Sequence, residues 1–300
     1  MRTILITGSN GLLGQKLINK LREDSEVNLV ATSKGANRIS ASAGYEYHDL
    51  DITKQEEVEA IFNLYKPHVV INTAAMTNVD ACESDKEGCW KLNVTAVEYL
   101  IKAAESHRSH LIHLSTDFIF DGESGPYKED DTPNPLSYYG ESKLAAEQLI
   151  GKAKTKWAIA RTIIVYGVAE NMSRSNIVLW AKGALEKGES LNIVNDQFRS
   201  PTLAEDLADG CILIAEKEAE GIFHLSGKDL MSIVDLVRKV AHFFSLDEST
   251  IQEISSTSLN QAAKRPPKTG FVISKAINEL GFKPHSFEGG LEMISKQIKA

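Results

Sequence analysis

Residues 1–120 alternate between short apolar runs and longer amphipathic ones. Continuous apolar runs are typical of parallel strands covered on both faces, whereas apolar residues at helical spacing indicate the covering helices. This alternation predicts an α/β fold with a doubly wound parallel sheet. We expect its strands at residues 2–8, 27–33, 68–75, 110–120 and 157–167. Helices are expected at residues 12–23, 55–66, 89–107 and 142–153.

The pattern loosens after Tyr166, where we expect a smaller lobe to begin. Residues 177–188 have helical spacing, 190–194 resemble a short strand, and 195–202 resemble a loop. A helix over 203–219 and a strand at 221–227 are expected to return to the main sheet. The predicted division is a nucleotide-binding domain of residues 1–166, joined by 201–225, and a substrate lobe of 167–200 and 226–300. The substrate cleft is expected at the carboxyl ends of the parallel strands.

Composition limits the classes of partner. The chain is 42% hydrophobic and 25% charged, which is typical of a soluble globular protein. Its net charge of -8 argues against nucleic acid or an anionic membrane as the main partner. No apolar run is long enough for a membrane span, and the apolar part of MRTILITGSN is too short for a secretory signal. We therefore expect a cytoplasmic protein. Its oligomeric state is left open between a monomer and a homodimer.

Neither a disulfide framework nor a metal site is expected. The cysteines are few and odd in number: Cys82, Cys89 and Cys211. Three histidines at three-residue spacing straddle the end of a predicted helix and the start of a strand: His107, His110 and His113. Since they do not share a face, we expect no metal there.

A glycine-rich turn, TGSNGLLG, follows the first strand and opens the first helix. Gly8 would allow a tight turn, Gly11 a close approach of backbone to a pyrophosphate, and Gly14 close packing of helix on sheet. The free N–H groups of the helix N-terminus would face the phosphates. The strand–turn–helix context favours a dinucleotide site over an ordinary turn.

The second strand bears on the choice of dinucleotide. It ends ATSKGANR, without the acid that would hold the 2′-hydroxyl of NAD. Ser33, Lys34 and Arg38 supply a hydroxyl and two cations that suit a 2′-phosphate, so we favour NADPH, with NADH possible. The alternative is that both cations are solvated loop charges. Asp51 and Ile52 are expected to contact the adenine.

The stretch NPLSYYGESKLAAEQL contains a tyrosine and a lysine four residues apart. This spacing places Tyr139 and Lys143 on one helix face, whereas Tyr138 points elsewhere. A nearby ammonium would lower the tyrosine pKa, so that the phenol could give its proton to a carbonyl oxygen. The strand ending Ser115-Thr116 offers a hydroxyl for the same oxygen. The alternative is a helix start with an exposed lysine.

These motifs resemble the extended short-chain dehydrogenase/reductases. GSNGLLG, INTAA, LNV, STDFIFDG, PYKEDDTPNPLSYYGESK, RTIIVYG, NDQFRSPT and KRPPKTG follow the order and spacing of that superfamily over most of the chain. Within it, the chain most resembles the dTDP-4-dehydrorhamnose reductase family. The resemblance implies a Rossmann domain with a small C-terminal substrate lobe. It also implies NAD(P)H-dependent reduction of a nucleotide-linked 4-keto sugar, dTDP-4-dehydro-L-rhamnose to dTDP-L-rhamnose.

The resemblance also implies roles for individual residues. The catalytic groups would be Thr116, Tyr139 and Lys143. Together with the motif analysis, it gives cofactor contacts at Gly8, Ser9, Asn10, Gly11, Leu12, Leu13, Gly14, Ser33, Lys34, Arg38, Asp51, Ile52, Ala74, Ala75, Met76, Asn93, Ser115, Tyr139 and Lys143. Asn93 resembles the asparagine that supports the active-site helix. Substrate contacts are expected at Thr77, Val79, Asp80, Thr116, Asp117, Ile164 and Arg199.

Three departures from the family pattern leave the substrate open. Ile164 stands where a tryptophan is common, Arg199 replaces a glycine, and Thr269 replaces a serine. Arg199 could contact a diphosphate or fill space left by another ligand. Two other functions remain: an epimerase or dehydratase of the same superfamily, and a non-catalytic NADP-binding regulatory subunit.

Overall fold

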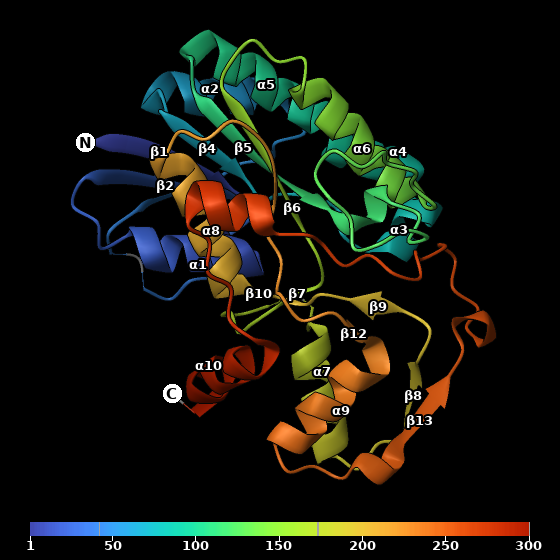
Figure 1. Cartoon of the computed structure of the whole chain (residues 1–300). Helices are drawn as coiled ribbons and strands as arrows, with labels where there is room; N and C mark the ends of the chain where they lie inside the picture. The colour runs from blue at the N-terminus through green and yellow to red at the C-terminus, as the bar shows by residue number, and fades with distance from the viewer. Residues whose placement is uncertain (42, 173, 300) are drawn as a thin grey trace.

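A parallel sheet of seven strands forms the centre of the protein (Figure 1). The computed structural model describes residues 1–41, 43–172 and 174–299. The strands lie in the order β11-β6-β5-β4-β1-β2-β3, and every neighbouring pair is parallel. Their bounds are β1 (Arg2–Thr7), β2 (Val27–Ser33), β3 (Glu46–Asp49), β4 (Val69–Asn72), β5 (His110–Thr116), β6 (Trp157–Thr162) and β11 (Gly221–His224). The doubly wound parallel fold predicted from the sequence is confirmed.

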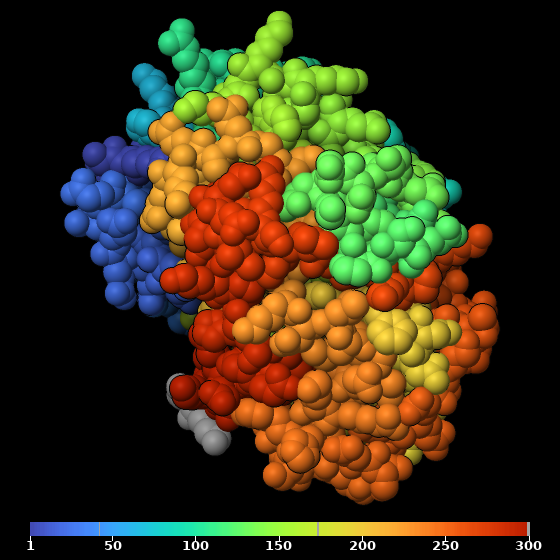
Figure 2. Space-filling model, in the orientation of Figure 1, coloured from blue at the N-terminus to red at the C-terminus, as the bar shows by residue number. Residues whose placement is uncertain are grey.

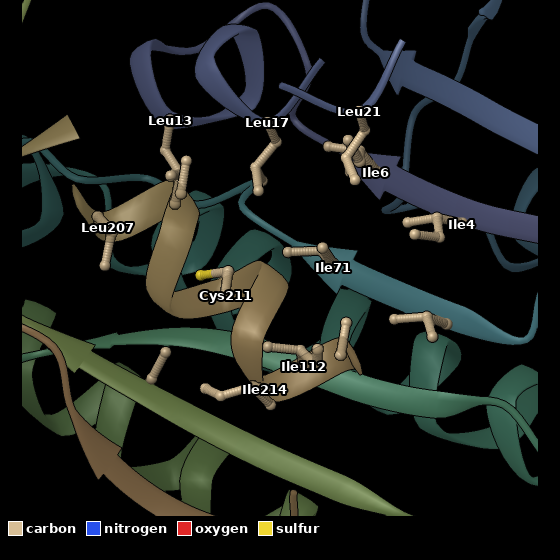
Figure 3. Close-up of a cluster of buried hydrophobic side chains, with 14 of the residues drawn as sticks. Ile4, Ile6, Leu13, Leu17, Leu21, Ile71, Ile112, Leu207, Cys211 and Ile214 are labelled. Atoms are coloured by element: carbon tan, nitrogen blue, oxygen red, sulfur yellow. The ribbon is translucent and has the colours of Figure 1, made fainter. Parts of the chain in front are cut away.

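Helices cover both faces of this sheet, which explains the apolar composition of its strands. One face packs against α1 (Leu12–Leu21) and α8 (Ala204–Glu216), as Figure 3 shows for Leu13, Leu17 and Cys211. The other face packs against α2 (Gln55–Tyr65), α5 (Ala96–His107) and α6 (Tyr138–Ile150). In the part of the chain that the structure describes, no helix combines the length and apolar character needed to cross a membrane.

Most of the elements after β6 form a smaller lobe below the sheet in Figure 1. Its helices are α7 (Ile177–Glu186), α9 (Ile233–Phe243) and α10 (Phe287–Lys299). Three short strand pairs complete it: β8 (Leu191–Val194) with β13 (Ile251–Ile254), β9 (Phe198–Arg199) with β12 (Met231–Ser232), and β7 (Val165–Tyr166) with β10 (Thr202–Leu203). The lobe has its own apolar core, which includes Val178, Leu236 and Leu291.

The C-terminal part of the chain does not stay in the smaller lobe. Ala276 and Leu280, in a π-helical segment (Ala276–Leu280), and Phe282 pack into the core between the sheet, α1 and α8. Figure 2 shows the red C-terminal segment lying over the front of both parts. Residues 276–282 therefore belong with the sheet rather than with the predicted lobe of 226–300. The two-part division of the chain otherwise stays a prediction.

Several predicted elements differ in their bounds. The strand expected at 157–167 breaks between β6 and β7, because Ile164 has a φ of 26° and leaves the extended conformation. The helix expected from Ser142 begins at Tyr138, where Ser137 caps it by accepting a bond from the Gly140 N–H. The expected helix at 89–107 is three segments: α4 (Lys86–Trp90), a π-helical segment (Lys91–Thr95) and α5. The loop expected at 195–202 contains β9, and α3 (Val79–Ser84) was not predicted.

The structure predicts opposite effects for two helical Gly→Ala substitutions. A methyl group at Gly14 would lie 2.5 Å from the Gly8 carbonyl oxygen, whereas one at Gly183 meets nothing within 4 Å. We expect Gly14→Ala to lower the free energy of unfolding by about 1–3 kcal/mol through overpacking. Gly183→Ala, in α7, should raise it by about 0.5–1 kcal/mol. Urea denaturation measures both, and a neutral Gly14→Ala would contradict the close packing of α1.

Candidate active site

A cavity of about 710 Å³ opens at the carboxyl edge of the sheet and lies between the sheet and the smaller lobe. This is the position expected for the substrate cleft. Fourteen predicted site residues line it: Asn10, Gly11, Leu12, Leu13, Arg38, Ala75, Thr77, Val79, Ser115, Thr116, Asp117, Tyr139, Lys143 and Ile164. Residues from six separate stretches of the sequence therefore meet at one cavity.

The glycine-rich turn has the geometry that a bound dinucleotide needs. Gly8 has a φ of 73°, and a side chain there would lie 2.6 Å from the Ala74 nitrogen. The N-cap position, Gly11, has no side-chain cap, so the first N–H groups of α1 are free to face an anion. The hydroxyls of Ser9 and Ser115 are buried and have no hydrogen-bond partner among the described residues. These residues fit a pyrophosphate and its ribose.

The turn also fixes the loop after β2. The Asn10 side chain donates to the Ala36 carbonyl oxygen at 2.9 Å and accepts from the Arg38 N–H at 2.9 Å. Asn10 therefore holds the loop that carries Lys34 and Arg38, the two cations expected near a 2′-phosphate. Ser33, also predicted to contact the cofactor, is the last residue of β2 and lies beside Asp49 of β3.

A second cavity of about 450 Å³ lies beside this loop, where the adenine end of the cofactor is expected. Lys34 and Asp51 both line it, and their side chains form an ion pair at 2.8 Å. Bonds from Lys34 and Thr53 outweigh the effect of burial and lower the pKa of Asp51 to about 2. Ile52 is buried and does not line this cavity. One predicted adenine contact, Asp51, and one predicted phosphate contact, Lys34, therefore share this surface, and Lys34 is not a free cation.

Tyr139 lies in the first turn of α6, buried against Cys82, Cys89 and Phe118. Burial raises the pKa of its phenol, and the Thr116 hydroxyl lowers that pKa in part. The phenol is therefore protonated at neutral pH. By contrast, Tyr138 lies at the surface, with Lys86 over its ring and Trp90 beside it. The structure thus distinguishes the two adjacent tyrosines as the helical spacing predicts.

Lys143 is buried one turn after Tyr139. In this arrangement it does not lower the pKa of the tyrosine as expected. Its Nζ lies 2.9 Å from Nε2 of His113 and donates to the Leu114 carbonyl oxygen at 2.6 Å. Burial lowers the pKa of Lys143 itself to about 8. The sequence prediction that a nearby ammonium lowers the pKa of Tyr139 is therefore wrong for the protein alone. Burial of the phenol dominates instead.

Asn93 does not line the cavity, although it was grouped with the cofactor contacts. It lies in the π-helical segment, where its Oδ1 accepts from the Met76 N–H at 2.8 Å. Its Nδ2 donates to the Met76 carbonyl at 3.1 Å and to the Ser142 hydroxyl at 3.0 Å. Asn93 thus connects the loop after β4 to helix α6, which holds Tyr139 and Lys143.

Arg199 is only 2% exposed and does not face the cavity. Its guanidinium donates to the carbonyl oxygens of Phe198, Pro267 and Pro266, at 2.7, 3.2 and 2.6 Å respectively. Its Nε lies 3.5 Å from a carboxylate oxygen of Asp117. The expectation that Arg199 contacts a diphosphate is therefore not supported, because its donors hold β9 against the C-terminal chain.

Asp117 and Asp80 also attach the C-terminal chain to the site. Asp117 accepts a hydrogen bond from Thr269, the residue that replaces the serine of the family pattern. Asp80, in α3, forms an ion pair with Arg265 and accepts from the Ala263 N–H at 3.0 Å. Asp80 was expected at the substrate, but it does not line the cavity.

Ile164 lines the cavity in a strained conformation. A φ of 26° is rare for a β-branched residue and costs about 1–3 kcal/mol. Its carbonyl accepts from the Thr202 N–H at 3.1 Å, which joins β7 to β10. The break turns this residue into the cavity, at the position where a tryptophan is common in the family.

Some residues at the site were not predicted from the sequence. Arg174 lines the cavity from the loop before α7, and its guanidinium lies 3.4 Å from the Thr77 hydroxyl. Further unpredicted lining residues are Met172, Ser175, Asn176, Ile177 and Leu207. No motif marks Arg174; only its place between the two parts of the chain could have indicated it.

Known proteins resemble this chain over its whole length. The sequence model of the RmlD substrate binding domain matches residues 1–300. The chain belongs to the RmlD substrate binding domain family. A dTDP-4-dehydrorhamnose reductase of Aggregatibacter actinomycetemcomitans is 32% identical over 98% of each chain. Methionine adenosyltransferase 2 subunit beta of Xenopus tropicalis is 33% identical over 88% of this chain and 78% of its own.

A solved structure agrees with this assignment. The dTDP-4-dehydrorhamnose reductase of Bacillus anthracis, in complex with NADP, is 26% identical and covers 99% of this chain and 100% of its own, with a TM-score of 0.86. The RmlD family and the extended reductase fold expected from the motifs are confirmed.

Arg199 and Arg174 should respond differently to substitution by alanine. Arg199→Ala would leave Asp117 buried without its ion-pair partner, so we expect unfolding to become easier by about 3–5 kcal/mol. Arg174→Ala removes an exposed side chain and should change stability by less than about 0.5 kcal/mol. Thermal and urea denaturation measure both. An Arg199→Ala protein of unchanged stability would show that Arg199 does not fasten the C-terminal chain.

Proposed function

We propose that this protein is an NADPH-dependent reductase of the 4-keto group of a nucleotide-linked 6-deoxyhexose, with dTDP-4-dehydro-L-rhamnose as substrate and dTDP-L-rhamnose as product. The observation that carries this proposal is the meeting of Thr116, Tyr139 and Lys143 at one cavity beside the glycine-rich turn. The reductase relatives and the NADP complex of the Bacillus anthracis protein support the same activity.

The residues of the turn would hold the cofactor. The N-terminus of α1 would face the pyrophosphate, and the Ser9 and Ser115 hydroxyls would supply unpaired polar atoms nearby. NADPH supplies a hydride at the carbonyl carbon when bound. Lys34 and Arg38 lie on the loop after β2, where their charges suit the 2′-phosphate. Lys34 would then exchange its bond with Asp51 for one with the phosphate.

Tyr139 supplies the proton in this scheme. Burial keeps its phenol protonated, which is the state required to donate to the carbonyl oxygen during reduction. The Thr116 hydroxyl, 3.2 Å from Asp117 Oδ1, lies beside the phenol and can polarise the same oxygen. Lys143 lies one turn further along, where its remaining N–H can contact the ribose.

The smaller lobe would recognise the rest of the substrate. Arg174 is a cation at the cavity wall that takes no part in the reaction, and it can bind the diphosphate of a nucleotide sugar. Ile164 and Val79 offer apolar contacts, and Thr77 offers a hydroxyl. Ile164 in place of the common tryptophan leaves more room beside the sugar.

A second candidate function is a non-catalytic NADP-binding regulatory subunit. The similarity to methionine adenosyltransferase 2 subunit beta, at 33% identity against 32% for the reductase, favours it. The retained Tyr139 and Lys143 favour an enzyme. A stable complex with another protein, without reductase activity, would support the regulatory function. Tightly retained NAD(H) after purification would instead support an epimerase or dehydratase.

The reaction is tested by following NADPH absorbance with dTDP-4-dehydro-L-rhamnose, made in place from dTDP-glucose by the two preceding enzymes. We expect oxidation of NADPH with formation of dTDP-L-rhamnose. Tyr139→Phe should still bind NADPH but lose turnover by about 10²–10⁴-fold, because the proton donor is removed.

Tyr138→Phe is the matched control, since it removes the hydroxyl of the neighbouring surface tyrosine. It should retain nearly full activity. Equal activity of Tyr139→Phe and Tyr138→Phe would exclude Tyr139 as the proton donor, and absence of turnover by the unmodified protein would favour another keto sugar or the regulatory function.

Cofactor preference is tested with Lys34→Ala. The substitution removes one cation expected at the 2′-phosphate, so KM for NADPH should rise by about tenfold. KM for NADH, which lacks that phosphate, should change little and serves as the internal control. A parallel rise for both cofactors would show that Lys34 acts through Asp51 and not through the phosphate.

A further inference from the structure

A buried row of polar side chains crosses the sheet beneath the candidate active site. Thr7 of β1, Asn72 of β4 and His113 of β5 are paired in register, so their side chains lie on the same face of three adjacent strands. None is more than 1% exposed. The row ends at Lys143, whose Nζ lies 2.9 Å from His113 Nε2. Polar groups this deep need complementary donors and acceptors throughout.

The direction of these hydrogen bonds follows from one backbone group. The N–H of Ala74 can only donate, and it points to Oδ1 of Asn72 at 3.2 Å. The Thr7 hydroxyl donates to the same oxygen at 2.6 Å. The other end of the Asn72 amide is therefore the NH₂ group, which donates to Nδ1 of His113 at 3.0 Å. This assignment leaves Nδ1 of His113 without a proton.

A neutral imidazole that accepts at Nδ1 carries its proton on Nε2. Burial and the neighbouring Lys143 hold the pKa of His113 well below its usual range, so the ring is neutral. Its Nε2–H then points at the Lys143 nitrogen. An ammonium has no lone pair to accept this bond, whereas an uncharged amine has one. The amine can also donate to the Leu114 carbonyl, 2.6 Å away.

We propose that the charge of Lys143 is coupled to the tautomer of His113 through the Thr7–Asn72–His113 row. The uncharged amine requires the proton on Nε2 and the Asn72 amide as it stands. The ammonium requires Nε2 as an acceptor, hence the proton on Nδ1 and a reversed Asn72 amide. Reversal would point the NH₂ group of Asn72 at the Ala74 N–H, so that two donors face each other. Because the ammonium requires this reversal, the contact favours the uncharged amine of Lys143. His113 is thus a positioning residue that acts through Lys143.

The other groups around Lys143 do not reverse this preference. Glu147 of α6 and Cys89 of α4 face it and raise its pKa, but burial outweighs both and lowers the pKa to about 8. Glu147 is itself paired with Arg161 of β6 at 2.8 Å. Tyr139, one turn before Lys143, is a protonated phenol and brings no charge.

The coupling is tested by NMR on the full-length labelled protein, which follows the ring nitrogens of His113 and the ε-carbon of Lys143 from about pH 6 to about pH 10. Signals are assigned by their loss in His113→Gln and Lys143→Met. We expect Lys143 to titrate near pH 8, with the His113 proton on Nε2 above that midpoint and on Nδ1 below it. A proton on Nδ1 at every pH, or a tautomer that does not change as Lys143 titrates, would overturn the proposal.

Asn72→Asp provides a second measurement. A carboxylate can accept from the Ala74 N–H with one oxygen and from the His113 Nδ1–H with the other. The Lys143 ammonium can then form without any rearrangement of the side chain at position 72. We expect the midpoint of Lys143 to rise by about one pH unit or more. The carboxylate charge also acts through space, and the double variant Asn72→Asp/His113→Phe measures that part alone. An equal rise in the single and double variants would show that His113 transmits nothing.

A kinetic measurement can also be made, and it is the one test here that rests on the proposed reductase function. The pH dependence of kcat/KM in Asn72→Asp should shift in the same direction as the Lys143 midpoint. His110→Gln changes another buried histidine of β5, outside the row, and should leave the profile in place. If the protein reduces no substrate, the proposed function fails while the NMR result still decides the coupling.

Discussion

The parallel register of β1, β4 and β5 is the constraint on which the candidate active site depends. It places Thr7, Asn72 and His113 side by side near the carboxyl edge of the sheet, where β1 ends at Thr7 and β4 at Asn72, while β5 continues to Thr116. The polar groups at that edge are then held from below by a network that has few alternative arrangements. The position of Lys143 follows from this network, and the position of Tyr139 follows from Lys143 through helix α6. The pairing of β1, β4 and β5 thus helps to set where the side chains of the candidate active site lie.

The fold and much of the site could be predicted because they depend on local patterns. Apolar runs and helical spacing identify the sheet and its helices, and the glycine-rich turn and the Tyr139–Lys143 pair have characteristic local spacings. The break at Ile164 could not be predicted, since RTIIVYG is a continuous apolar run. Helix α3 is too short to show periodicity. The errors therefore lie where tertiary contacts override the local sequence.

The roles of single charges were the least predictable. Arg199 departs from the family pattern, and its sequence neighbours are compatible with a ligand contact. Its actual partners, Pro266 and Pro267, lie more than sixty residues away and could not be inferred. The same holds for Lys143 of α6, which is linked through His113 of β5 to the amide of Asn72 on β4. A sequence motif specifies which groups meet, whereas the proton that each group carries depends on the whole buried environment.

The C-terminal chain has a consequence for how the protein is made. Thr269 bonds to Asp117 across 152 residues, and Arg265 pairs with Asp80 across 185 residues. Synthesis proceeds from the N-terminus, so strands β1 to β6 and the glycine-rich turn leave the ribosome long before these partners, whereas α8, β11 and residues 276–282 of the same core follow late. During that interval the cavity wall at Asp117 lacks its support. The nascent chain therefore carries the glycine-rich turn early and completes this wall of the cavity only after residues 265–269 have been made.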